Sequence, residues 1–233
     1  MSWDLEELRN LVKHTRDEDQ LAKIKPHLDN VAWKISISNY HHYTSKNAFD
    51  SFFNDSENNA LQAFKLLFGA SESSIKFDRA RLVAEANAIA CAQHMHSISD
   101  VLAHTIYHSL KSLDLDENDV SLVTISRSID NGPLKDEIVK LLGCREFCYI
   151  KDFVNTTKHH SLVFSEYSVN LENLGKEEHG MKFKSFSYTP RESDKAREHK
   201  EKTHYQILNE LEKLVFRYTS IGKELNKYVA QQT

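Results

Sequence analysis

Three polar side chains near residue 155 have a spacing that could support acid–base chemistry. Asp152, Asn155 and His159 are separated by three and then four residues, so on a helix they lie along one face. An imidazole titrates near neutral pH and can act as a general acid or base, while an amide can orient that imidazole or a bound phosphate. Lys158 lies beside this face and could stabilise phosphate charge. The segment is therefore the first candidate for a catalytic site.

A structural role is the alternative for the same helix end. Lysine and protonated histidine near the C-terminus of a helix interact favourably with its dipole. His160 points about 100° away from His159 and is expected to pack or to contact a partner chain. Spacing alone leaves both a catalytic site and a helix cap open.

The segment resembles the motif of the HEPN superfamily, helical-bundle proteins that include many RNases of toxin and antiviral systems. The family signature is Arg, a polar residue that is often Asn, three variable residues, and His. The matching positions here are Val154, Asn155, residues 156–158 and His159. The Asn, the His and the Lys-His-His ending match, whereas Val154 stands where the family has Arg. The resemblance covers helices expected over 76–113 and 134–160.

The resemblance implies metal-independent cleavage of RNA, or binding of RNA or a nucleotide, by a homodimer in which two such motifs face each other. His159 would act on the 2′-hydroxyl or the leaving oxygen, and Asn155 would position it. Lys158 could replace the missing Arg only as a point charge, because it lacks the bidentate fork that suits phosphate. The alternative is a non-catalytic binding or regulatory module that uses this helix end to contact a protein partner.

A second set of polar residues follows one helix at steps of four residues: His96, Asp100, His104 and His108. Three of them, His96, Asp100 and His104, could bind a divalent metal, since His and Asp are common ligands in helical bundles. A polar seam satisfied by neighbouring helices is the second interpretation. In a third, His96 and Asp100 face the helix of His159 and complete its pocket. The sequence indicates no other cofactor.

The elements that must position these residues are expected to be mostly helices. The 233 residues include only six Gly and three Pro, which favours long helices over short strands and tight turns. Apolar positions at helical spacing predict a long central helix over 76–113 and helices over 134–160 with a joint at Gly143. We therefore predict a mostly α, multi-helix bundle that forms a single domain over 1–233.

The remaining segments complete this bundle. Residues 1–75 are predicted to form N-terminal helices, with Pro26 in the first turn of one of them. The apolar period changes over 161–189, which predicts a β-hairpin with a polar tip. Thr189 and Pro190 then provide the cap and first turn of a C-terminal helix over 190–233. Its charged start, residues 191–202, mixes both signs and is expected to be an exposed helix face.

Charge and composition restrict the class of protein. A net charge of −4 excludes a global basic field for DNA or anionic membranes. Three cysteines and no recognisable secretory signal favour a reducing cytoplasm. No apolar stretch approaches the roughly 18 residues of a transmembrane helix, so we expect no membrane association.

Overall fold

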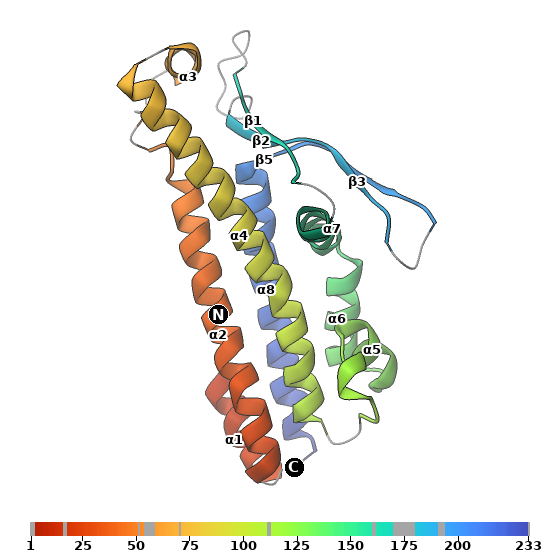
Figure 1. The fold of residues 1–233 in the computed structure, drawn as a ribbon. Helices are drawn as coiled ribbons and strands as arrows, with labels where there is room; N and C mark the ends of the chain where they lie inside the picture. The colour runs from red at the N-terminus through yellow and green to blue at the C-terminus, as the bar shows by residue number, and fades with distance from the viewer. Residues whose placement is uncertain are drawn as a thin grey trace. The chain divides into compact units, whose positions relative to one another are not determined.

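Helices dominate the computed structural model, which describes residues 3–15, 18–50, 52–53, 59–69, 71–110, 113–159, 162–169, 180–190 and 194–232 (Figure 1). The helices are α1 (Leu5–Thr15), α2 (Glu18–Lys46), α3 (Asn59–Phe68), α4 (Glu72–Ser109), the short 3-10 helix η1 (Glu117–Asp119), α5 (Leu122–Ser128), α6 (Pro133–Gly143), α7 (Arg145–His159) and α8 (His204–Ala230). The predicted mostly α, multi-helix class with one long helix is confirmed, since α4 alone has 38 residues. Among the described helices, none is both long enough and apolar enough to cross a membrane.

The chain forms two compact units. The first unit comprises Met1–Ile37, Gln93–Ile150 and Leu211–Thr233, and the second comprises Ser38–Ala92 and Lys151–Glu210. Four helices, α2, α4, α7 and α8, contribute residues to both units. The candidate residues therefore divide by unit: the residues of the long helix from His96 onward belong to the first, and the end of α7 belongs to the second.

The first unit has an aliphatic core formed by α2, α4 and α8. The α4 positions predicted to share one face, Met95, Ile98 and Leu102, are all buried. Tyr218 of α8 is 1% exposed, and its hydroxyl donates a hydrogen bond to the Met95 carbonyl at 3.0 Å. The hydroxyl of this core tyrosine is thereby satisfied, as a buried polar group requires.

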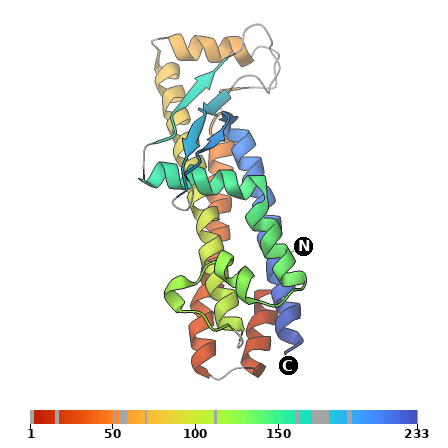
Figure 2. The same cartoon turned by 90° about the vertical axis from the view of Figure 1, so that its right-hand side faces the viewer.

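The second unit has an aromatic core covered by short strands: β1 (Ser165–Ser168), β2 (Gly180–Phe183), β3 (Phe186–Tyr188), β4 (Arg197–His199) and β5 (Lys202–Thr203). Strands β1 and β2 pair antiparallel, which confirms the predicted hairpin, and β5 pairs with the other edge of β2. Strands β3 and β4 form a separate antiparallel pair. Phe153 of α7 packs edge-on against Phe183 and Phe186, at 5.3 and 6.0 Å between ring centroids. Figure 2 shows these strands beside the last turns of α7.

Two predicted helix starts were wrong. Helix α2 runs through Pro26 instead of starting there, because buried Ile24 and Leu28 on either side of the proline hold the helix together against the cost of a missing N–H. The C-terminal helix α8 begins at His204 rather than near Pro190. Residues 194–203 contain one apolar side chain, Ala196, and so have no stripe to bury as a helix. They form β4 and β5 instead.

His204, the first residue of α8, is a titratable group in the aromatic core. It is fully buried, and its ring centroid lies 3.9 Å from that of Tyr205 and 5.8 Å from that of Phe49. Burial disfavours the charged imidazolium and lowers the pKa of His204 from 6.5 to about 4. The folded protein therefore keeps this imidazole neutral at pH values where the unfolded chain would protonate it.

We predict that His204 makes the folded state less stable as the pH falls. Its pKa is lower in the folded state, so its contribution is complete above about pH 6.5 and disappears as the pH falls to about 4. The loss amounts to about 3 kcal/mol. His204→Phe keeps the ring but cannot titrate, so urea unfolding should show a smaller loss of free energy between pH 7 and pH 4 than in the wild type. Identical pH profiles would contradict the assignment.

Candidate functional site

The buried carboxylate of Asp152 is the centre of the candidate site. Arg197 donates two hydrogen bonds to it, from Nε to Oδ2 at 2.7 Å and from Nη2 to Oδ1 at 2.5 Å. His199 Nε2 lies 2.8 Å from the same Oδ2. We call these three residues the Asp152 cluster. They join helix α7 to strand β4 within the second unit.

The strand geometry of β4 explains why two of its side chains reach one carboxylate. Arg197 and His199 are two residues apart, so they project from the same face of the strand. Each lies opposite an aromatic residue of β3. His199 stacks on Phe186 with 4.7 Å between ring centroids, and the Arg197 guanidinium lies 6.0 Å from the Tyr188 ring. The two cross-strand aromatic contacts restrict the rotamers of the arginine and the histidine.

The Asp152 cluster spans the boundary between core and surface. The Asp152 side chain is 0% exposed, that of His199 is 13% exposed and that of Arg197 is 43% exposed. A buried carboxylate is costly unless it is paired and hydrogen-bonded, and the fork of Arg197 supplies both. Because a carboxylate only accepts, His199 must carry a hydrogen on Nε2. The cluster therefore presents an oriented guanidinium at the surface and an imidazole of defined orientation behind it.

Asp152, Asn155 and His159 do lie on α7 as predicted, but Asp152 contacts other residues than His159. Asn155 is half-buried, and Lys158 and His159 are exposed on the last turn. Asp152 lies seven residues before His159, about 10 Å along the helix axis, so its carboxylate orients His199 and not His159. His160 lies outside the described residues. In the part of the chain that the structure describes, neither Asn155 nor His159 forms a side-chain hydrogen bond.

Arg197 and His199 were not identified from the sequence. The run 191–202 was expected to be a solvated helix face, whereas its described part contains strand β4. The signal available was an Arg and a His at alternate positions of a charged run, in a chain whose HEPN-like motif lacks its Arg. Val154, which occupies the arginine position of the motif, is 0% exposed and packs in the core. This position of the motif therefore offers no cation at the surface of α7.

The two segments that contain the Asp152 cluster have more basic than acidic side chains, although the whole chain is acidic. Residues 151–159 and 194–200 together contain five lysine or arginine side chains against three carboxylates. One of the carboxylates is the buried Asp152. The exposed cations are Lys151, Lys158, Lys195, Arg197 and Lys200. Exposed basic side chains in these segments favour the approach of phosphate groups.

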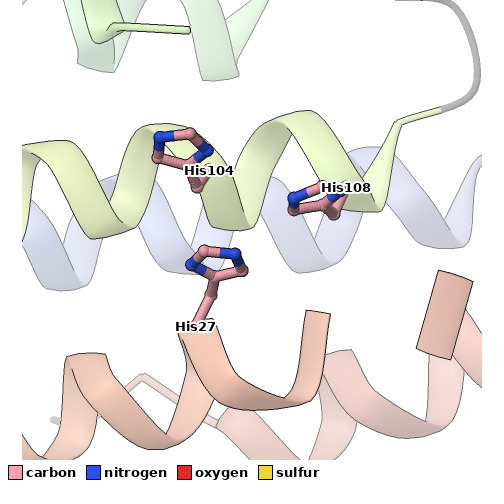
Figure 3. Close-up of side chains that lie close together, drawn as sticks. All are labelled: His27, His104 and His108. Carbon is pink, nitrogen blue, oxygen red and sulfur yellow. The ribbon is translucent and has the colours of Figure 1, made fainter. Parts of the chain in front are cut away.

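The predicted stripe on α4 does not act as one set. His96 stacks on Phe147 with 6.2 Å between ring centroids, and Asp100 is exposed. His104 instead lies next to His27 and His108 (Figure 3). These three histidines are the one group of three or more metal-capable side chains found among the described residues. His96 and Asp100 belong to the first unit and His159 to the second, so a shared pocket stays a prediction.

Two of the three histidines, His27 and His108, have lowered pKa values. Burial lowers the pKa of His27, and the positive charge that His104 can carry lowers it further. Burial likewise lowers the pKa of His108, with His27 as the next cause, while Glu117 acts in the opposite direction. The neutral form of His27 and of His108, which is the form that binds metals, is therefore favoured.

We predict that Arg197→Ala destabilises the second unit by roughly 1–3 kcal/mol, because it leaves the Asp152 carboxylate buried with only His199 as a partner. The double variant Asp152→Asn with Arg197→Ala should recover part of this loss, since it buries no charge. Arg79→Ala, at an exposed position of α4, removes the same charge as a control and should change stability by less than about 0.5 kcal/mol. Urea unfolding measures all three, and equal losses for Arg197→Ala and Arg79→Ala would contradict the pairing.

Comparisons with known proteins do not add to this picture. No protein-family model, curated protein or solved structure matches the chain.

Proposed function

We propose that this protein acts on RNA through the surface formed by the end of α7 and strand β4, and that it is a HEPN-like protein whose phosphate-binding cation is Arg197. One observation carries the proposal: the guanidinium of Arg197 is held by Asp152 of α7. Asp152 lies about one helical turn before Asn155, on the helix that ends with His159. The position of the missing motif arginine, Val154, is buried. Arg197 supplies the cation that this position cannot.

Phosphate binding follows from the way the guanidinium is held. Arginine has five N–H donors, of which Nε–H and one Nη2–H bond to Asp152. The side chain is 43% exposed, so its outer edge can meet a phosphate in the bidentate geometry that lysine cannot offer. Because Asp152 and Tyr188 hold the guanidinium plane, little rotamer entropy is lost on binding. The surrounding lysines strengthen attraction for a polyanion.

Cleavage without a metal requires two proton transfers. A base removes the proton of the ribose 2′-hydroxyl, the 2′-oxygen attacks phosphorus, and the bond from phosphorus to the 5′-oxygen breaks as an acid protonates that oxygen. The products are a 2′,3′-cyclic phosphate and a 5′-hydroxyl. His159 is the exposed imidazole for one transfer, with Asn155 beside it to position the ribose or phosphate. His199 is the second imidazole, and Asp152 is its positioning residue.

A homodimer belongs to this proposal through the family resemblance. Two copies of the α7 end facing each other would double the number of imidazoles and cations around one RNA strand. The rival proposal, a binding or regulatory module without catalysis, uses the same surface and the same Arg197. Binding and cleavage are therefore tested separately.

We predict that single-stranded RNA binds through Arg197. In fluorescence anisotropy with labelled RNA, Arg197→Ala should weaken binding about tenfold and reduce the salt dependence by about one phosphate contact. Arg197→Lys should fall between this variant and the wild type, because it keeps the charge but loses the fork. Arg79→Ala controls for loss of an exposed arginine and should bind like the wild type. Absence of RNA binding by the wild type, or equal effects of the two alanine variants, would refute the proposal.

We predict that the wild type cleaves RNA in the presence of EDTA and leaves 2′,3′-cyclic phosphate ends. His159→Ala and His199→Ala should each reduce the rate by about 100-fold, the usual size of a general acid or base effect. His14→Ala, at an exposed histidine of α1, should leave the rate unchanged. If the wild type binds RNA through Arg197 but cleaves none, the nuclease proposal is wrong and the binding module is supported instead. Cleavage that survives loss of both imidazoles would contradict the assigned roles.

A further inference from the structure

We propose that His27, His104 and His108 form a binding site for a divalent transition-metal ion, with zinc as the best-suited ion. This site lies in the first unit and does not depend on the proposed action on RNA. It also differs from the site suggested by sequence spacing, because His27 of α2 and His108 of α4 take the places of His96 and Asp100.

The three side chains come from two helices and point toward one another. His104 and His108 are four residues apart on α4, so they project from one face, and His27 projects toward them from α2 (Figure 3). One ring nitrogen of each lies within 4.8 Å of the others. Tetrahedral zinc with bonds near 2.0–2.1 Å needs its nitrogen ligands about 3.4 Å apart. In the metal-free structure the rings are stacked, with angles of 9°, 23° and 26° between the ring planes. Metal binding therefore requires the imidazole rings to rotate until one nitrogen lone pair of each points at the ion, and we propose that the helix backbones stay in place.

The three histidines are partly or fully buried, and one of their nitrogen atoms lacks a hydrogen-bond partner among the described residues. His108 is 6% exposed, and His27 and His104 are half-buried. The Nδ1 atom of His104 is buried and has no hydrogen-bond partner among the described residues. Buried polar atoms in folded proteins nearly always have a partner. A metal ion in the plane of the rotated His104 ring, or a water bound to that ion, would give this nitrogen its partner.

The charges around the three histidines suit a cation with an open coordination position. The Glu117 carboxylate of η1 lies 3.7 Å from His108 Nε2 and is exposed, so it can approach the ion as a fourth ligand or hold a metal-bound water. Lys23 of α2 is close enough to lower the pKa of His108 and opposes a cation in part. Three imidazoles and a carboxylate or water are a common zinc coordination set, and imidazole ligands also suit copper, nickel and iron.

Metal binding would join α2 to α4 in the first unit. The ion binds the folded chain, in which the three imidazoles are already close, more tightly than the unfolded chain, in which they are far apart. It therefore raises the stability of the folded state by mass action. Zinc at about 100 times its Kd should raise the melting temperature by roughly 5–10 °C.

The test uses the full chain without a histidine tag, freed of metal by chelation and titrated with zinc in a calorimeter. We expect one ion per chain, and at least tenfold weaker binding for each of His27→Ala, His104→Ala and His108→Ala. His96→Ala is the matched control on the same helix and should keep wild-type affinity. Titration with Co²⁺ adds a second readout, since a tetrahedral site with nitrogen ligands gives intense visible absorption that the three variants should lose.

Melting curves of the metal-free variants separate loss of a ligand from loss of folding. A ligand variant that melts cooperatively without metal, but gains no stability from zinc, supports the site. Failure of the wild type to bind zinc would overturn the proposal. So would binding that His96→Ala abolishes and His27→Ala preserves, because the ion would then occupy the stripe along α4. Since RNA cleavage is measured in EDTA, each proposal can fail without the other.

Discussion

The buried carboxylate of Asp152 is the constraint on which the second unit depends. Helix α7 carries a charge to a fully buried position, and a carboxylate in such a place is tolerated only when cations and donors surround it. Arg197 and His199 meet this need. These contacts hold β4 against α7. They also hold β3 there, because β3 pairs with β4. The late start of α8 is consistent with this arrangement, because the residues before it are needed as a strand.

The same interaction links stability to the proposed function. A guanidinium used only for structure could be fully buried, and one used only for phosphate would need no carboxylate partner. Arg197 is held by Asp152 and remains 43% exposed, which suits both roles. Loss of Arg197 should therefore affect unfolding and RNA binding together. The His159→Ala variant separates the two effects, since His159 lies on the exposed last turn of α7 and contributes little to the core.

Much of the fold could be predicted from the sequence because the relevant signals are local. The apolar stripe of α4, the joint after Gly143 and the β1–β2 hairpin each follow from the spacing of neighbouring residues. The candidate site was only half predictable. Asp152 was identified, but its partner Arg197 is 45 residues away and lies in a charged run that looks like a solvated surface. His27 was also missed because it is distant in sequence from His104 and His108. The spacing of residues along α4 cannot reveal a histidine on α2.

We propose two different chemistries for the two units: phosphate recognition at the end of α7 and metal binding between α2 and α4. In the first of these, Arg197, His199 and His159 contact the RNA. A decisive measurement is NMR titration with a short RNA that carries a 2′-deoxy sugar, which binds but cannot be cleaved at that position. We expect saturable shifts of the Arg197 Nε–H resonance and of the His199 and His159 ring resonances at the same RNA concentration. Saturation of binding with these three resonances unmoved would contradict the proposal.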